Sequence, residues 1–361
     1  MAVPIARPTL GPEEAEAVQE VLESGMIAAG KRVADFEDRF AACCGVTHAV
    51  AVNSGTAALH AALLAAGIGP GDEVIVPSFS FIATATAVSM CGARPVFADV
   101  EPERYTIDPA SAAALVTERT KAVIGVHLYG QVCDAPAIAN LCADSDLIFI
   151  EDAAQAHGAS LDGRRAGSIG DLGCFSFYAT KNITTGEGGM VTTADDDYAA
   201  RLRRIINHGQ SEKYLHTELG YNYRMTDIAA AIGLVQLDRL DGFNRRRQET
   251  AAYYSSGIDS PWLHTPSTAP GAGHVFHQYV LRVEDSAPLE RDGLMAHLRL
   301  KGIGTAVHYP VPIHRQPLYI GHTASCPVAD ALAASVFSIP VHPTVTDEDR
   351  TLIVDTLNEV A

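Results

Sequence analysis

Positive charge is scarce in this chain of 361 residues. Lysine and arginine together number 26, against 43 aspartates and glutamates, so the net charge is −17. An acidic chain is repelled by nucleic acid and by anionic membrane surfaces, and we expect no nucleic-acid partner. A ligand that carries a phosphate must then be held by local features of a site, against the field of the whole protein.

Long apolar runs and paired cysteines are also missing. No run approaches the length that spans a bilayer, and the first residues lack the basic start and apolar stretch of a secretory signal, so we expect a cytoplasmic protein without a membrane partner. The seven cysteines are scattered and form no C-x-x-C pair. This pattern predicts reduced thiols in apolar settings, with neither a disulfide framework nor a metal site.

The sequence does contain a regular alternation of strand-like and helical segments, which starts near residue 33. Short apolar runs occur at residues 48–52, 72–76, 95–99, 122–126 and 147–150, with helical patterns between them. This alternation predicts an α/β fold whose large domain has three layers, α/β/α, around a mainly parallel sheet. Ligands bind beyond the carboxyl ends of the strands in such sheets, so the residues after each run are the candidates for a site.

A second, smaller unit is predicted in the C-terminal third. A long helical pattern begins at Thr226 and carries the chain into a region with strands at 277–283 and 305–309 and helices at 289–301, 327–335 and 347–360. We predict a large domain at 1–240, whose residues 1–32 form an N-terminal arm, and a small α+β domain at 241–361.

The segment 174–193 is the most informative part of the chain. An apolar run ends at Tyr178, Lys181 follows, and a glycine-rich turn at 186–189 leads into a second strand-like run. A lysine at a strand exit, followed by glycines that let the backbone approach a ligand, suits an amine used in covalent chemistry. The alternative is a solvated lysine in a hairpin turn.

Three further positions follow strand-like runs. Gly55 and Thr56, with Ser54, open a helix and could bind an anion, or could be an ordinary N-cap. Asp152, with Glu151, ends a very apolar run and needs a cationic partner such as a protonated ring nitrogen, or is a helix cap or a buried salt bridge. Phe81 could stack on a flat cofactor or belong to the core.

Taken together, these positions meet the needs of one cofactor. An amine for a Schiff base, a carboxylate for a pyridine nitrogen, an anion site for a phosphate and a stacking surface are what pyridoxal 5′-phosphate requires. No G-x-G-x-x-G follows the first predicted strand, which disfavours a dinucleotide-binding oxidoreductase.

Six segments in this order resemble the DegT/DnrJ/EryC1/StrS family of sugar aminotransferases, which have the aspartate-aminotransferase fold type I. The segments are Ser54-Gly-Thr-Ala-Ala-Leu59, Pro77-Ser-Phe-Ser-Phe81, Glu151-Asp-Ala-Ala-Gln155, Ser176-Phe-Tyr-Ala-Thr-Lys181, Gly186-Glu-Gly-Gly189 and Gly220-Tyr-Asn-Tyr-Arg-Met225. The likeness extends over nearly the whole chain, to 308–314 and 338–343.

The resemblance implies a role for each matching residue. Lys181 would form the Schiff base, Asp152 would pair with the pyridinium nitrogen, Gln155 would lie near the phenolic oxygen, and Phe81 would cover one ring face. The phosphate would be held by Gly55, Thr56 and Ser176, and by Asn222 from a second subunit, which implies an obligate homodimer. Possible substrate contacts are Tyr223, Arg224, His308, Tyr309 and His314.

The activity implied is a ping-pong transamination from L-glutamate, with glutamine as a weaker alternative, through pyridoxamine 5′-phosphate. The acceptor would be a keto group of a nucleotide-linked sugar, and the resemblance favours C4 of a 4-keto-6-deoxyhexose over C3. Related alternatives are a keto-cyclitol acceptor, a sugar dehydratase or a non-catalytic regulator of the same fold. Dehydratases of the family carry histidine where this chain has Lys181, which favours amino transfer.

Overall fold

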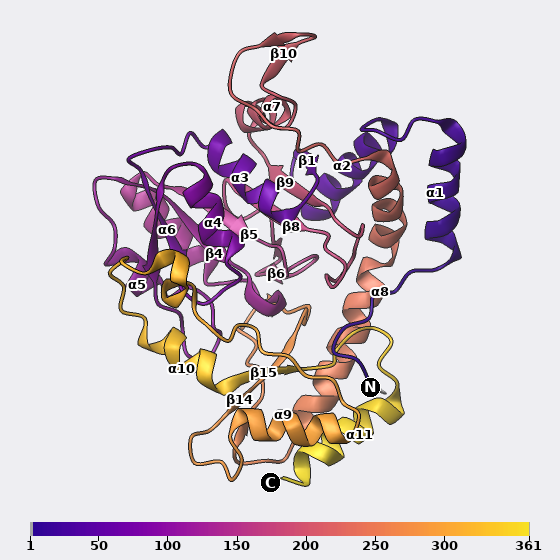
Figure 1. Ribbon diagram of the computed structural model, residues 1–361, viewed down its shortest axis with the longest axis vertical. Coiled ribbons are helices and arrows are strands. Elements are labelled where there is room, and N and C mark those ends of the chain that lie inside the picture. The colour runs from indigo at the N-terminus through magenta and orange to yellow at the C-terminus, as the bar shows by residue number, and fades with distance from the viewer. Residues whose placement is uncertain (1–2, 361) are drawn as a thin grey trace.

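The computed structural model describes residues 3–360 and is built around one seven-stranded sheet (Figure 1). Across the sheet the strands are β1 (His48–Val52), β9 (Gly189–Thr193), β8 (Leu172–Ser176), β5 (Ile148–Asp152), β4 (Thr120–Val126), β2 (Glu73–Pro77) and β3 (Arg94–Ala98). β9 runs antiparallel to both of its neighbours, and the other six strands are mutually parallel. The predicted fold class, α/β with a mainly parallel sheet, is confirmed.

Alternate side chains of each strand enter two different cores. In β2, Val74 and Val76 belong to one apolar cluster while Ile75 belongs to the other. All five residues of β2 are buried, as expected for a strand that is covered on both faces. The apolar runs of the sequence therefore correspond to the centre of a three-layer domain.

Helices cover both faces of this sheet. One face packs against α3 (Gly55–Ala65), α4 (Ala83–Met90) and α7 (Asp196–Ile205), and the other against α2 (Lys31–Cys44), α5 (Pro109–Ala113), α6 (Ala135–Ser145) and the first part of α8 (Asp227–Gly257). Because the parallel strands share one direction, their carboxyl ends lie along a single edge of the sheet. Every residue predicted for cofactor binding except Asn222 lies at or just beyond this edge.

A smaller unit lies at the far end of α8, in the lower part of Figure 1. Its elements are β12 (Leu263–His264), β14 (Tyr279–Val283), β15 (Val336–Ile339), α9 (Arg291–Leu300), α10 (Pro327–Ser335) and α11 (Asp347–Asn358). The predicted boundary at 240/241 falls inside the continuous helix α8. The division into domains at that point remains a prediction.

The predicted strand at 305–309 was wrong. In that segment only Ala306 pairs, in an isolated bridge to Ser338, and the strand that pairs with β14 is β15. Residues 336–339 carry no alternating pattern, because β15 is buried along its whole length.

The remaining helices and strands lie outside the two main sheets and their covering helices. They are α1 (Pro12–Ser24), β6 (Ser160–Leu161), β7 (Arg164–Arg165), β13 (Ala272–Gly273), the hairpin β10 (Gln210–Glu212) and β11 (Leu215–His216), and three short 3₁₀ turns. The hairpin projects from the top of the molecule in Figure 1. None of the helices in the described part of the chain is both long enough and apolar enough to span a membrane.

Candidate active site

A cavity of about 400 Å³ lies at the carboxyl edge of the sheet. Its walls come from the starts of α3 and α4, the ends of β4, β5 and β8, the turn after β8, and two segments of the C-terminal unit. The lining residues are Ser54, Gly55, Thr56, Leu59, Ser80, Phe81, Ala83, Val126, Asp152, Ala154, Gln155, Ser176, Tyr178, Thr180, Lys181, Glu187, His277, Gln278, His308 and Tyr309. The cavity is thus closed by segments that are far apart in the sequence.

Lys181 lies in the turn between β8 and β9, and its backbone N–H donates a hydrogen bond to the carbonyl of Tyr178 (2.9 Å). Within residues 3–360 its amine makes neither a hydrogen bond nor an ion pair, so it is free to meet a ligand in the cavity. Burial lowers the pKa of this amine to about 8, and the charge of Asp152 opposes part of that change. A substantial neutral fraction, the nucleophilic form, is therefore present near pH 8.

Asp152 is the last residue of β5 and is only 5% exposed. Its carboxylate accepts a hydrogen bond from the hydroxyl of Thr84 (2.7 Å) and one from the backbone N–H of Ala154 (3.2 Å). Burial raises the pKa of Asp152, although these hydrogen bonds and Lys181 partly offset the effect. In the described structure no arginine, lysine or histidine pairs with it, and a buried carboxylate of this kind suits a cationic ligand atom.

Glu151, the preceding residue, points to the other side of β5 and is fully engaged. It accepts hydrogen bonds from His127 Nε2 (2.7 Å) and from the backbone N–H groups of Gly167, Ile169 and Gly170 (2.7–2.8 Å). Burial alone would raise the pKa of Glu151, but His127 and these N–H donors bring it below its usual value. Of the two adjacent carboxylates, Asp152 is therefore the one available to a ligand.

An anion cradle lies where β8 ends beside the first turn of α3. Ser54 caps α3, since its hydroxyl accepts a hydrogen bond from the N–H of Ala57 (3.1 Å), and Gly55 and Thr56 begin the helix. The N–H groups of a first helical turn have no acceptor within the helix and attract anions. A Cβ on Gly55 would lie 2.6 Å from Cβ of Ser176, so only glycine lets the helix start approach the strand this closely.

Gln155 and Phe81 complete the part of the wall predicted to contact a cofactor. The Gln155 side chain accepts a hydrogen bond from the N–H of Tyr129 (2.8 Å) and donates one to the Tyr309 hydroxyl (3.0 Å), which fixes its orientation. The Phe81 ring is 54% exposed at the rim and lies 5.9 Å from the Tyr309 ring. A Phe in the core would be buried, so the exposed position is consistent with the stacking interpretation.

The structure brings His308 and Tyr309 to the cavity but not the other predicted substrate residues. Tyr223 bonds His60 (3.0 Å), Arg224 bonds Asn207, and His314 lies 3.3 Å from Asp330. Asn222 is exposed and outside the cavity of its own chain. Its predicted contact, from a second subunit, remains a prediction.

Several cavity residues were missed by sequence reasoning. The polar ones include Ser80, Glu187, His277 and Gln278, which line the cavity. Thr84, also missed, does not line it but reaches the site through its hydrogen bond to Asp152. Glu187 lies in the glycine-rich turn and could have been found there. His277 and Gln278 lack a local signal, because only the packing of the C-terminal unit brings them to the sheet edge.

Within residues 3–360, one cavity of an α/β fold brings together a lysine amine and a carboxylate, both without an ion-pair partner, and an anion cradle. These are the features that the class of pyridoxal-phosphate-dependent transferases requires. The chain belongs to the DegT/DnrJ/EryC1/StrS aminotransferase family, whose profile matches residues 8–358. It is therefore an aminotransferase.

Individual relatives agree with this assignment. The chain is 40% identical to GDP-perosamine synthase of Caulobacter vibrioides, over 99% of this chain and 98% of that protein. A crystal structure of S. venezuelae DesV in complex with a ketimine intermediate is 42% identical, with a TM-score of 0.93 over 96% of this chain and 94% of that one. The PLP form of the putative sugar aminotransferase Spr1654 from Streptococcus pneumoniae is 30% identical, with a TM-score of 0.94 over 100% and 98%.

Proposed function

We propose that this protein moves an amino group from L-glutamate to a keto group of a nucleotide-linked 4-keto-6-deoxy sugar, with pyridoxal 5′-phosphate as cofactor. The observation that carries the proposal is the presence, in one cavity, of the Lys181 amine and the buried Asp152 carboxylate without a cationic partner in the described structure. A lysine and an aspartate so placed suit a pyridine cofactor held by a Schiff base and paired through its ring nitrogen.

The residues present fit this cofactor. The N–H groups of Gly55 and Thr56 and the Ser176 hydroxyl suit a phosphate, Asp152 suits a protonated ring nitrogen, and Gln155 offers an amide beside the expected phenolic oxygen. When bound, pyridoxal phosphate supplies an electron sink for the bond broken next to the amino nitrogen. The relative solved in a PLP form supports the same cofactor here.

Lys181 would have two roles in the reaction. Its Nζ would hold the cofactor, and when not bound to it the same Nζ would take a proton from the α-carbon of the amino acid. With a pKa lowered to about 8, the amine accepts and returns a proton near neutral pH. Asp152 would keep its charge beside a ring cation, because an opposite charge at close range favours ionisation of both groups.

The acceptor class rests on relatives. GDP-perosamine synthase, 40% identical over nearly the full length of both chains, supports a nucleotide-linked sugar as the acceptor. The choice of C4 over C3 follows from the sequence resemblance alone. The cavity volume of about 400 Å³ is in the range of small-molecule sites. L-glutamate as the donor follows from the sequence resemblance.

We also propose that the enzyme is a cytoplasmic homodimer with sites at the interface. Phe81 and Tyr178 line the cavity yet are 54% and 47% exposed, and Tyr214 on the projecting hairpin is 82% exposed. Exposed aromatic side chains are common where a second subunit packs against a surface and buries them. Asn222→Ala should leave the dimer intact by sedimentation and weaken cofactor binding, and full activity of a dilute monomer would contradict this proposal.

The first test is the visible absorption spectrum with added pyridoxal phosphate, before and after L-glutamate. The wild type should show a Schiff-base band that bleaches with glutamate, Lys181→Ala should not form the band, and Lys121→Ala, a change at an exposed lysine, should behave as wild type. The enzyme that has received the amino group is then incubated with 4-keto and 3-keto nucleotide sugars. The product is identified by mass spectrometry. A band indifferent to every amino donor would exclude transamination and favour a dehydratase or a binding role.

A further inference from the structure

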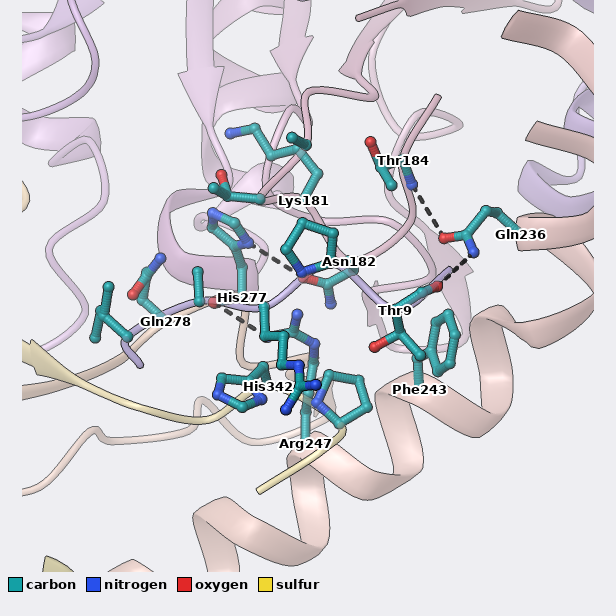
Figure 2. A pocket seen from close by; sticks show the side chains of 17 residues that line it. Thr9, Lys181, Asn182, Thr184, Gln236, Phe243, Arg247, His277, Gln278 and His342 are labelled. Carbon is teal, nitrogen blue, oxygen red and sulfur yellow. Dashed lines mark hydrogen bonds between the residues drawn. The ribbon is translucent and has the colours of Figure 1, made fainter. Parts of the chain in front are cut away.

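A second, much smaller pocket of about 20 Å³ lies behind the Lys181 turn (Figure 2). Residues of the N-terminal arm, of the Lys181 turn, of α8 and of the C-terminal unit line it, and His277 and Gln278 line both this pocket and the main cavity. His277 is therefore part of the wall between the two spaces. It is 5% exposed, and the reaction described above leaves it without a role.

A chain of buried amides leads to His277 from a backbone carbonyl. The carbonyl of His157 can only accept, so Asn244 must direct Nδ2 to it (2.8 Å) and Oδ1 to Asn182. Asn182 then donates Nδ2 to Asn244 Oδ1 (2.8 Å) and to the carbonyl of Val275 (3.2 Å). Both amide orientations follow from hydrogen bonding alone.

This chain determines the tautomer of His277. Oδ1 of Asn182 is left facing His277 Nδ1 at 3.2 Å, and because this oxygen only accepts, Nδ1 must carry the hydrogen. In Figure 2 the second ring nitrogen is turned away from Asn182, toward the side where the Lys181 side chain ends. Nε2 therefore presents an unprotonated lone pair, provided that the ring is neutral.

The surroundings of the His277 ring keep it neutral. Burial lowers the pKa of His277 well below its usual value, and the positive charges of Lys181 and Arg247 lower it further, with smaller contributions from His308 and His157. Arg247 also donates to the carbonyls of Phe276 and His277 (3.2 and 3.3 Å), which holds this backbone in place.

Two groups without partners thus line the main cavity. Among the residues that the structure describes, neither the Lys181 amine, a donor, nor His277 Nε2, an acceptor, makes a hydrogen bond within the protein. We propose that His277 is a positioning residue for Lys181: its Nε2 accepts an N–H of the amine whenever the lysine is free, which directs the amine lone pair at the substrate α-carbon. This inference rests on the proposed function and adds a residue to it.

The tautomer is measured in the cofactor-free protein, so that it does not depend on activity. With ¹⁵N-labelled histidine, the signals absent from His277→Gln identify His277, and we expect a protonated Nδ1 and an unprotonated Nε2 at pH 8. Asn182→Ala, which removes the oxygen that faces His277 Nδ1, should allow the other tautomer to appear. An Nε2–H form or an imidazolium in the wild type would overturn the inference.

The kinetic test measures single-turnover bleaching of the Schiff-base band over a range of L-glutamate concentrations up to saturation. His277→Leu should slow this step about ten- to hundredfold through misplacement of the amine, with a larger α-deuterium isotope effect and an unchanged half-saturating concentration. His277→Gln, which keeps an acceptor, should recover most of the rate. The control, His274→Leu, changes a nearby buried histidine that does not line the main cavity.

The outcomes separate the two proposals. A wild type that never bleaches refutes the proposed function, while the tautomer still tests the inference. The role of His277 is refuted if the wild-type band bleaches and the His277→Leu band bleaches equally fast. It is also refuted if His277→Leu changes only the half-saturating concentration of L-glutamate.

Discussion

Gly55 provides the sharpest test of the anion cradle. In Gly55→Ala the new Cβ would lie 2.6 Å from Cβ, 3.0 Å from Oγ and 3.3 Å from Cα of Ser176. Carbon atoms in contact sit about 3.5–4.0 Å apart, so the helix start and β8 must separate by roughly 1 Å. Overpacking of this size costs about 1–3 kcal/mol.

The cost should appear mainly in phosphate binding. Alanine favours a helix by up to about 1 kcal/mol over glycine, which offsets part of the strain in the free protein. Widening the cradle displaces the N–H groups from the phosphate, so we expect about 5- to 150-fold weaker binding of pyridoxamine 5′-phosphate, the equivalent of that strain. This ligand cannot form a Schiff base with Lys181 and therefore reports on the cradle alone.

The assay is a fluorescence titration of the cofactor-free protein, with thermal unfolding in parallel. Pyridoxal, which lacks the phosphate, should bind the variant and the wild type equally. Gly242→Ala is the matched control, because it lies inside α8 with no atom within 4 Å of the new Cβ. Wild-type affinity of Gly55→Ala for pyridoxamine phosphate would refute the assignment of the cradle.

Two further predictions concern charge in the cavity. Asp152→Asn keeps an acceptor for the Thr84 hydroxyl but removes the negative charge. The Schiff-base band should still form, but its bleaching rate with L-glutamate should fall by at least about 100-fold. An unchanged rate would show that Asp152 does not support the ring nitrogen. Burial lowers the pKa of Lys181 from 10.5 to about 8, so between these values the unfolded chain binds more protons than the cofactor-free native protein. Relative to Lys181→Met, the free energy of unfolding of the wild type should therefore rise from pH 8 to 10.5, as measured by urea denaturation, and parallel curves would contradict the lowered pKa.

Local sequence was sufficient for the large sheet and for much of the site. The apolar runs at 48–52 and 122–126 became strands because both faces of the sheet are covered, which produces a continuous apolar run that is easily recognised. Parallel strands place their carboxyl ends on one edge, so Gly55, Asp152 and Lys181 could be expected to meet there before any coordinates were known.

Other features required the tertiary structure, because they depend on contacts between distant segments. The strand predicted at 305–309 was wrong, since the pairing of β14 with β15 is decided by residues nearly sixty positions apart. Position and residue type alone do not separate Asp152 from Glu151, although the family resemblance favoured Asp152. The structure shows that the donors around Glu151 occupy that carboxylate and leave Asp152 available. The hydrogen bond at His277 Nδ1 likewise involves two asparagines, Asn182 and Asn244, from separate parts of the fold.

The sequence by itself therefore determined the class of fold and the edge of the sheet at which Gly55, Asp152 and Lys181 meet. The tertiary structure decided which side chains of the C-terminal unit close the cavity and which neighbouring groups are already satisfied. The physical reason is that strand and helix patterns arise from local periodicity, whereas hydrogen-bond satisfaction in a buried site depends on every segment packed around it.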